Sequence, residues 1–537
     1  MPDPQNISSL IAELAATQPD SPAVINGSRT ISFRELDAEI SLLANGLSQA
    51  GITPGLRTAL MVSPSIEFVA LTFALFRVGA VVVLIDPGIG LTNMRACLAE
   101  ARPEAFIGVP KAHVARLLFG WAKQTLRLLI TVGNNWFCGG ISIKDVRRLG
   151  VQATSPKNSA AKIDTAAILF TSGSTGVPKG AVYTHAMFAA QARMLKEYFG
   201  ITPGYYSVPT FPLFALFDIA LGLTIVIPEM NFTRPASVNP EMLCGLINKY
   251  HAAQLFGSPA LLDTLGRYGE KRGAQLPSLT RVISCGAPVS AAIIGRVKKM
   301  LTPETQVYTP YGATEALPVS CISSAELAVL EPGQPGICVG KRWEGMQIFI
   351  IKISDEPIAT WSKSLLAGSG EIGEIAVKGP VVSPEYFGRE SSTALAKIRG
   401  YGGELYHRMG DLGWIDTDGR LWFCGRKSHR VTTASTTLFT IPCEAVFNRH
   451  PEVRRTALVG IGPKGVQTPV LCVELETGIA QRDALRGELL DLGAAHEHTK
   501  NIKHILYHSG FPVDIRHNAK ISREKLAVWA EGQGIKP

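Results

Sequence analysis

The chain has 537 residues, of which 46% are hydrophobic and 18% charged, a composition that excludes a disordered chain and collagen-like or coiled-coil fibres. Its length predicts about two to four domains, each able to bury a core without disulfides or metal ions. Lys and Arg exceed Asp and Glu by 9 charges, and residues 426–537 hold 16 basic and 11 acidic residues, or +5. This basic last fifth suits phosphate-bearing ligands, an acidic partner or an ordinary solvated face. Aromatic and basic residues are not interleaved as they are in nucleic-acid binders, so we expect no nucleic-acid binding.

The N-terminal region predicts neither a membrane span nor a secretory signal. Its most apolar window, Ile66–Ile85, is interrupted by Glu67 and Arg77, and Gly79 breaks its helical pattern. It therefore falls short of about 20 uninterrupted apolar residues. Residues 1–18 include acidic residues and lack the apolar core of a signal peptide. The cysteines are scattered without a Cys-x-x-Cys pair, which fits a reducing compartment, and we expect a cytoplasmic protein.

The same region alternates between apolar runs and helix-length segments, as βαβ units do. Thr58–Val62 predicts a strand, Ser63 predicts a helix N-cap with Pro64 in the first helical position, and the helix should run to about Phe76. Ala80–Ile85, rich in β-branched residues, predicts a second strand. Because these strands are continuously apolar rather than alternating, we expect a parallel sheet that is buried on both faces.

Later segments first continue this pattern and then depart from it. Thr165–Phe170 and Arg281–Ser284 predict two further buried strands. Glu371–Val377 and Gly413–Gly425 instead predict short strands joined by turns, with Asp416–Gly419 as the turn of a hairpin.

The chain changes character again after Gly425. A basic stretch, Arg426–Arg430, directly follows the last of these strands. The remaining residues are about as many as one domain contains. We therefore predict an N-terminal domain, residues 1–425, and a C-terminal domain, residues 426–537.

The most informative stretch is the loop that follows the strand ending at Phe170. It is dense in glycine and hydroxyl residues and reads Thr171, Ser172, Gly173, Ser174, Thr175, Gly176, Val177, Pro178, Lys179 and Gly180. Glycines let backbone N–H groups wrap phosphate oxygens, hydroxyls add donors, and a lysine adds charge. Pro178 stands where a Walker A loop has glycine, and the glycine spacing is not that of a dinucleotide-binding loop. We interpret the stretch as a phosphate-binding loop rather than a flexible turn.

The loop resembles the pyrophosphate-binding signature of the adenylate-forming superfamily, which includes acyl-CoA synthetases, firefly luciferases and the adenylation domains of peptide synthetases. Further strings similar to that family's motifs follow in its order and cover nearly the whole chain: Tyr311–Glu315 (Tyr-Gly-Ala-Thr-Glu), Gly410–Leu412, Gly425–Lys427, and Lys520 within Asn518–Ile521. The resemblance implies an α/β fold. A large N-terminal domain would contain packed, mostly parallel sheets with helices and a small β-barrel-like part, and a small mobile α+β domain would follow it.

The resemblance also implies ATP and Mg²⁺ as cofactors, with attack of a carboxylate on the α-phosphate to give an acyl-adenylate and pyrophosphate. Since both reactants are anions, the barrier is largely electrostatic, and catalysis must neutralise charge and align the reacting groups. The implied catalytic residues are Lys520 between the carboxylate and the α-phosphate, Thr314 at the α-phosphate, Glu315 as the Mg²⁺ ligand, and Arg426 near the domain hinge. The implied nucleotide-binding residues are Thr171, Ser172, Gly173, Ser174, Thr175, Gly176 and Lys179 in the phosphate loop, Gly286, Ala287 and Pro288 along the purine, Tyr311 stacked on it with Gly312 beside it, and Asp411 at the ribose hydroxyls.

Three departures separate the chain from the acyl-CoA ligases of this superfamily. Where those enzymes carry a glycine-rich loop for the pantetheine arm of CoA, this chain has Val431–Phe439, which contains no glycine and is stiff with β-branched residues. Ala215 stands in place of the usual histidine, Met409 in place of a threonine, and Ala519 in place of a glycine. In Pro212–Phe217, Thr309–Ser320 and Asp514–Lys520 the chain most resembles the β-lactone synthetases of bacterial olefin biosynthesis. Those enzymes adenylate a long-chain 3-hydroxy acid and close it to a β-lactone without a thiol.

This resemblance implies a ligase whose substrate is a long-chain 3-hydroxy carboxylic acid and whose partners are proteins of the same lipid pathway. Phe214, Leu216 and Phe217 are candidates for the lining of its acyl pocket, although ordinary core packing explains them about equally well. One alternative is a fatty acid–CoA ligase with an unusual tunnel loop. Another is a binding or scaffold protein without chemistry, against which the presence of Lys520 and Glu315 argues.

Overall fold

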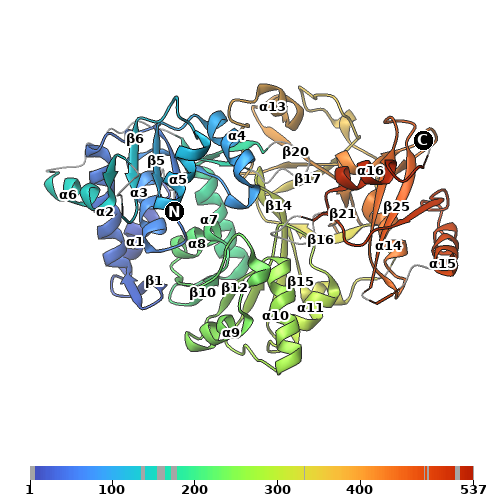
Figure 1. The fold of residues 1–537 in the computed structure, drawn as a ribbon, viewed down its shortest axis with the longest axis horizontal. Helices are drawn as coiled ribbons and strands as arrows, with labels where there is room; N and C mark the ends of the chain where they lie inside the picture. Colours follow the sequence, from blue (N-terminus) through green and yellow to red (C-terminus); the bar gives the residue numbers. More distant parts are fainter. Residues whose placement is uncertain are drawn as a thin grey trace.

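The computed structural model describes residues 6–134, 139–153, 164–170, 178–331, 333–476, 478–479, 483–513 and 521–535. In Figure 1 the N-terminal elements lie at one end of the long axis and the C-terminal elements, in red, at the other end. Helices alternate with strands through the first three hundred residues, and strands predominate in the hundred that follow. The fold is thus α/β, as the sequence predicts.

A sheet of seven described strands forms the N-terminal part of the molecule. Its order is β7-β6-β5-β3-β4-β8-β9, and all its pairs are parallel except β8 with β9. The strand order reverses between β3 and β5, because β4 follows on one side of β3 and β6 follows on the far side of β5. Ligands of open α/β sheets bind beside the carboxyl ends of strands at such a point. The strands are β3 (Arg57–Met61), β4 (Val81–Leu84), β5 (Ala105–Gly108), β6 (Leu128–Thr131), β7 (Ile141–Ser142), β8 (Thr165–Phe170) and β9 (Gly180–Thr184). The predicted parallel strands at residues 58–62, 80–85 and 165–170 are confirmed.

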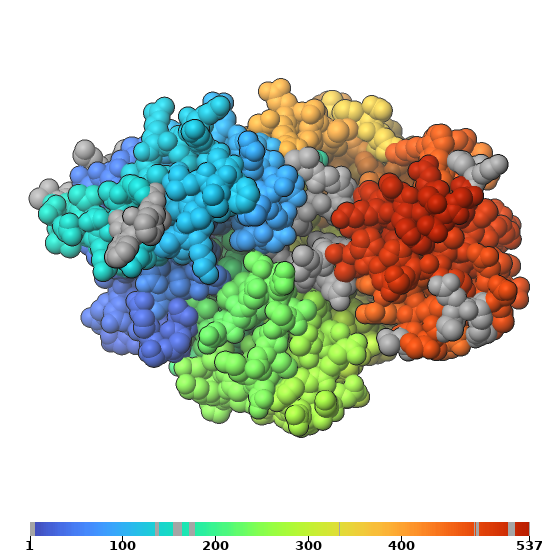
Figure 2. Space-filling view, viewed as in Figure 1, coloured from blue at the N-terminus to red at the C-terminus, as the bar shows by residue number. Residues whose placement is uncertain are grey.

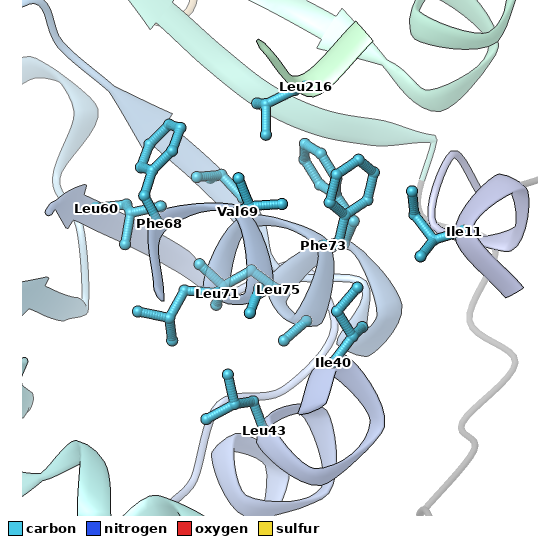
Figure 3. Close-up of a cluster of buried hydrophobic side chains, with 14 of the residues drawn as sticks. Ile11, Ile40, Leu43, Leu60, Phe68, Val69, Leu71, Phe73, Leu75 and Leu216 are labelled. Atoms are coloured by element: carbon cyan, nitrogen blue, oxygen red, sulfur yellow. The ribbon is translucent and has the colours of Figure 1, made fainter. Parts of the chain in front are cut away.

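Helix α3 (Ile66–Val78) lies between this sheet and α2 (Phe33–Gln49) and is buried along most of its length. Its N-cap is Ser65, whose side chain accepts a hydrogen bond from the backbone N–H of Phe68, so the predicted N-cap Ser63 is wrong by two residues. Gly79 ends the helix with a positive φ of 79°, which glycine adopts without strain. Figure 3 shows the side chains of α3 packed among those of neighbouring elements. The apolar window of the sequence is therefore a core helix followed by a strand.

A second sheet of fourteen described strands continues through the middle of the chain. Its order is β17-β18-β20-β21-β16-β15-β14-β13-β12-β10-β11-β1-β2, with β19 paired to β20. The run from β1 to β14 is parallel, and the run from β14 to β17 is antiparallel. The strands of the parallel run, with edge strand β2, are β1 (Pro22–Asn26), β2 (Arg29–Ser32), β10 (Tyr206–Pro209), β11 (Thr224–Ile227), β12 (Gln254–Phe256), β13 (Arg281–Ile283) and β14 (Gln306–Ala313). The antiparallel strands are β15 (Ala316–Ser323), β16 (Ile337–Arg342), β17 (Gln347–Ile351), β18 (Gly373–Lys378), β19 (Lys397–Arg399), β20 (Leu405–Ile415) and β21 (Arg420–Arg426). The predicted hairpin with its turn at Asp416–Gly419 joins β20 to β21.

Helices connect the strands of both sheets. Before the C-terminal part, the other α-helices are α1 (Ser9–Thr17), α4 (Leu91–Ala101), α5 (Pro110–Phe119), α6 (Ile143–Gln152), α7 (His185–Phe199), α8 (Pro212–Ala220), α9 (Pro240–Lys249), α10 (Pro259–Arg272), α11 (Ala291–Lys298), α12 (Ser324–Ala328) and α13 (Glu390–Ala396). Short 3-10 helices occur at η1 (Pro87–Ile89), η2 (Pro235–Ser237), η3 (Lys363–Leu365) and η4 (Lys427–His429). Within the described residues, no helix is both long and apolar enough to cross a membrane.

The C-terminal part has its own sheet and its own core. It contains β22 (Val431–Thr432), β23 (Thr437–Leu438), α14 (Thr440–Phe447), β24 (Val453–Ile461), β25 (Thr468–Leu475), α15 (Asp483–Ala494), β26 (His504–Tyr507) and α16 (Arg523–Glu531). Two hydrophobic clusters here contain only residues from 431 onward, and the clusters of the preceding sheets contain none of these residues. Since a domain has a core of its own, we propose that the domain boundary lies at residues 425–426.

Candidate active site

A cavity of about 2420 Å³ opens where the two large sheets and the C-terminal part meet. The predicted site residues that the structure describes all line it: Lys179, Phe214, Leu216, Phe217, Gly286, Ala287, Pro288, Tyr311, Gly312, Thr314, Glu315, Asp411 and Arg426. The predicted residues Thr171, Ser172, Gly173, Ser174, Thr175, Gly176 and Lys520 lie outside the described residues. The volume exceeds the 300–1,000 Å³ or so that holds one drug-sized ligand, so the cavity has room for more than one group of that size.

One side of the cavity is built from the carboxyl end of β14 and the β20–β21 hairpin. Asp411 and Arg426 face each other in the register of that hairpin, and Arg426 Nη1 lies 2.7 Å from Asp411 Oδ1. Tyr311 Oη donates a hydrogen bond of 2.6 Å to the other carboxylate oxygen, Oδ2. Burial and the charge of Asp411 raise the pKa of Tyr311 well above its usual value, so its hydroxyl stays a donor. Asp411 is therefore held in one orientation from both sides.

Glu315 belongs to the same side of the cavity, at the turn between β14 and β15. Its Oε1 accepts a hydrogen bond of 2.5 Å from Tyr386 Oη. The ammonium of Lys179 lies over the ring of Tyr386, 5.1 Å from its centroid. Burial lowers the pKa of Lys179, and the charge of Glu315 opposes that shift. The structure thus brings together a lysine of the predicted phosphate loop and the predicted Mg²⁺ ligand through Tyr386. We call Tyr311, Glu315, Tyr386, Asp411 and Arg426 the polar wall.

The backbone of the β14–β15 turn is held by groups on neighbouring segments. Tyr183 Oη donates a hydrogen bond of 2.5 Å to the carbonyl of Thr314, and the N–H of Ser383 donates one of 2.8 Å to the carbonyl of Glu315. Gly312 is needed here because a Cβ would lie 2.7 Å from the carbonyl oxygen of Ala316. These contacts fix where Thr314 and Glu315 face the cavity.

Two basic residues that no motif marks support this region. Arg389 binds Glu100 Oε2 through Nε at 2.8 Å and Nη2 at 2.5 Å, and its Nη2 donates to the carbonyl of Pro178 at 3.1 Å. It therefore ties the end of the predicted phosphate loop to α4. Lys397 is buried, which lowers its pKa to about 7, and its ammonium donates to Ser383 Oγ at 3.2 Å. Neither residue belongs to a string that resembles a motif.

The opposite side of the cavity is apolar and is formed mainly by α8. The ring of Phe214 stacks on Phe256, with centroids 3.9 Å apart and an interplanar angle of 15°. Leu216 is buried in the same cluster as α3, and in Figure 3 it lies beside Val69 and Phe73. We call Phe211, Phe214, Leu216, Phe217 and Phe256 the apolar wall. Phe214 therefore agrees better with pocket lining and Leu216 with core packing, although both line the cavity.

The C-terminal part also contributes to the cavity. Ile521, the residue after Lys520 in the chain, lines it, as does Arg523, whose Nη2 binds both carboxylate oxygens of Glu444 at 2.7 Å. The glycine-free stretch Val431–Phe439, in contrast, is not among the lining residues and folds as the β22–β23 hairpin. Its turn is braced by Thr433 Oγ1, which accepts from the N–H of Thr436 at 3.0 Å.

Comparison with known proteins gives the family. Residues 11–387 match the AMP-binding enzyme family, which covers more than half of the chain. The chain is 47% identical to the "Olefin beta-lactone synthetase" of Xanthomonas campestris pv. campestris, over 99% of this chain and 98% of that protein. It is also 47% identical to the protein of the same name in Stenotrophomonas maltophilia, over 99% of both. The chain belongs to the AMP-binding enzyme family.

The fold of this AMP-binding enzyme agrees with a solved structure. ATP-bound MatB from Rhodopseudomonas palustris superposes with a TM-score of 0.78 at 21% identity, covering 98% of this chain and 99% of that one. Adenylate-forming enzymes use ATP, so this chain is an ATP-dependent ligase. Both the predicted superfamily and the predicted α/β architecture are confirmed.

The polar wall of this AMP-binding enzyme fits what an adenylating site requires. A carboxylate fixed by Arg426 and Tyr311 accepts hydroxyl hydrogens, and carboxylate oxygen is the ligand type that Mg²⁺ prefers in proteins. Mg²⁺ commonly binds through one or two carboxylates together with substrate phosphates, so a single carboxylate at the position of Glu315 fits such a site.

Proposed function

We propose that this enzyme adenylates a long-chain 3-hydroxy carboxylic acid with ATP and Mg²⁺ and then closes it to a β-lactone. The observation that carries the proposal is the 47% identity over nearly full length to two olefin β-lactone synthetases. The polar wall and the apolar wall of one cavity support it, because the reaction needs a nucleotide and a long acyl chain side by side. A cytoplasmic location and protein partners from the same lipid pathway stay predictions.

In the first step, a carboxylate oxygen of the acid attacks the α-phosphorus of ATP, and the bond to the β-phosphate oxygen breaks. Asp411 accepts the ribose hydroxyls, and its fixed orientation aligns the nucleotide for this displacement. Tyr311 lies beside the adenine, with Gly286, Ala287 and Pro288 along the purine. Lys520 neutralises the two anions as they approach, since a flexible ammonium can contact both. Glu315 would hold Mg²⁺, which would offset phosphate charge when bound.

In the second step, the 3-hydroxyl oxygen of the same molecule attacks the acyl carbon. The bond from that carbon to the phosphate oxygen breaks, AMP leaves, and the hydroxyl proton goes to solvent. No thiol takes part. The braced β22–β23 hairpin supports this, because the flexible glycine-rich loop that CoA ligases use for the pantetheine arm is replaced by a β-branched turn closed on itself.

Product analysis tests both steps. The purified protein is incubated with ATP, Mg²⁺ and a long-chain 3-hydroxy acid, with and without CoA, and products are identified by mass spectrometry. We expect a β-lactone, AMP and pyrophosphate in equal amounts whether or not CoA is added. A CoA thioester that forms only with CoA would show a fatty acid–CoA ligase instead. Absence of AMP with every acid tried would contradict adenylation itself.

A further inference from the structure

Helix α5 carries an exposed apolar face on the outside of the seven-stranded sheet. His113 is its buried side chain, and the residues that follow on the outer face are largely exposed: Val114 by 47%, Leu117 by 57%, Leu118 by 75% and Phe119 by 39%. Val114 is three residues from Leu117 and four from Leu118, so these three share one side of the helix, and Phe119 is its last residue. Figure 2 shows this part of the chain, in light blue, at the molecular surface.

This apolar face continues into the cavity of the candidate active site. Phe119, at the end of α5, stacks on Trp121, with centroids 6.1 Å apart and planes at 24°. Trp121 is buried and lines the cavity, and so do Lys111 and Ala112 at the start of α5. The Phe119–Trp121 pair thus connects the exposed end of α5 to the cavity.

The segment that contains α5 carries charge of one sign. Residues 110–128 contain Lys111, Arg116, Lys123 and Arg127 and no acidic residue, so this short segment holds +4 of the chain's net +9. Lys111, Lys123 and Arg127 are exposed. A short helix with apolar residues outward and basic residues around them matches segments that lie in the interface of an anionic bilayer. A second protein copy offers no such match, since it would present the same positive charge.

We propose that this α5 surface, Val114–Phe119 with the basic residues around it, docks the enzyme on an anionic lipid bilayer. The leucines and Phe119 enter the interfacial region, and the basic side chains contact lipid phosphates. An apolar acid can then pass from the bilayer along Phe119 and Trp121 toward the cavity. The docking itself stands on the surface alone, and the passage of the acid rests on the proposed function.

Vesicle co-sedimentation tests the docking. The full-length protein is mixed with vesicles of phosphatidylglycerol and phosphatidylcholine, and separately with phosphatidylcholine alone. We expect binding to the anionic vesicles that weakens as salt is raised, because the phosphate contacts are screened. Leu117→Asp with Leu118→Asp should lower the bound fraction at least about tenfold, since each leucine side chain loses its apolar burial. Lys123→Glu with Arg127→Glu should lower it also.

A matched control places two aspartates at exposed apolar positions elsewhere. Val329→Asp with Val528→Asp, at residues 78% and 71% exposed, should bind anionic vesicles like the unmodified protein. All variants should keep pyrophosphate release with a short, water-soluble 3-hydroxy acid, and circular dichroism should show that they fold. No binding of the unmodified protein to anionic vesicles would overturn the proposal. So would a dimer in solution that Leu117→Asp with Leu118→Asp splits while vesicle binding is unchanged. Vesicle binding without any adenylation would keep the docking and reject the proposed function.

Discussion

The two walls of the cavity are built on different physical principles. The polar wall is a set of directional contacts, in which Asp411 has one hydrogen-bonding partner on each oxygen and Glu315 is held by Tyr386. Each contact needs a specific side chain at a specific place. The apolar wall is held by non-directional packing, which residues of similar volume satisfy about as well. A polar wall can therefore be recognised in a sequence by which residue types are present. An apolar wall can be recognised only by where apolar residues stand.

The largest effect is expected at Lys520, which the proposal assigns to the chemistry of the polar side. Lys520→Ala should lower pyrophosphate release about 10³-fold, because the charge that developing anions require is removed in the transition state. Single-turnover assays with saturating ATP measure this. Lys525→Ala, at an exposed lysine on α16, is the control and should be unaffected. Near-normal turnover of Lys520→Ala would reject the assignment.

Asp411→Asn should have the next largest effect. An amide cannot accept strongly from both Arg426 and Tyr311, and the guanidinium loses its counter-charge. Loss of a charge-assisted contact corresponds to about 1.5–3 kcal/mol, so kcat/KM for ATP should fall about 10- to 100-fold. Asp418→Asn changes an exposed carboxylate of the same hairpin and serves as the control. Equal kinetics of both variants would show that the polar wall does not hold the nucleotide.

Sequence motifs predicted Tyr311, Glu315, Asp411 and Arg426 of the polar wall, but neither Tyr386 nor the supporting residue Arg389. Every predicted site residue that the structure describes lines the cavity, because strand ends and hairpin register bring these positions together. Tyr386 and Arg389 were missed, since a tyrosine and an arginine in a loop are common and their partners lie 71 and 289 residues away in the chain. Contacts of such long range depend on the folded topology, which no local pattern encodes.

For the apolar elements, the sequence predicted the buried strands but not the roles of individual apolar side chains. Continuous apolar runs predicted β3, β4 and β8 as buried parallel strands, because burial on both faces is a local property of sequence. The N-cap of α3 was misplaced, since Ser63 and Ser65 are equally good caps in isolation and the structure uses Ser65. Phe214 and Leu216 could not be separated, because both are apolar residues of one helix and only tertiary packing distinguishes them.

Leu216→Ala and Phe214→Ala separate the two roles within the apolar wall. Leu216 lies in the core cluster with α3, so its truncation should cost about 2–5 kcal/mol of unfolding free energy. Phe214 stacks on Phe256 at the cavity, so Phe214→Ala should raise KM for a long-chain acid about tenfold and leave a short-chain acid nearly unaffected. Urea unfolding and chain-length kinetics measure these. A reversed pattern would exchange the two assignments.

Behind the apolar wall, the buried carboxyl of Asp218 gives a pH test. It accepts hydrogen bonds of 2.7 Å from Ser207 Oγ and from Gln254 Nε2, and burial raises its pKa to about 6. The unfolded chain ionises this group at a lower pH than the folded protein, so its contribution to stability falls as pH rises from about 4 to 6. The loss is ~3 kcal/mol at 1.36 kcal/mol for each pH unit. As pH rises over this range, the urea midpoint of Asp218→Asn should therefore rise relative to that of the unmodified protein. A constant difference between the two midpoints would contradict the prediction.

The smallest effect is expected at Tyr386, which contacts Glu315 through its hydroxyl and Lys179 through its ring. Tyr386→Phe keeps the ring beneath Lys179 and removes the hydrogen bond to Glu315. A single hydrogen bond is worth about 1 kcal/mol, so the Mg²⁺ concentration for half-maximal pyrophosphate release should rise about fivefold. Tyr401→Phe removes the same hydroxyl from a residue that is 92% exposed and should leave the Mg²⁺ titration unchanged. If Tyr386→Phe changes KM for the acid instead, then Glu315 faces the acyl side of the cavity, and the division into a polar and an apolar wall has to be redrawn.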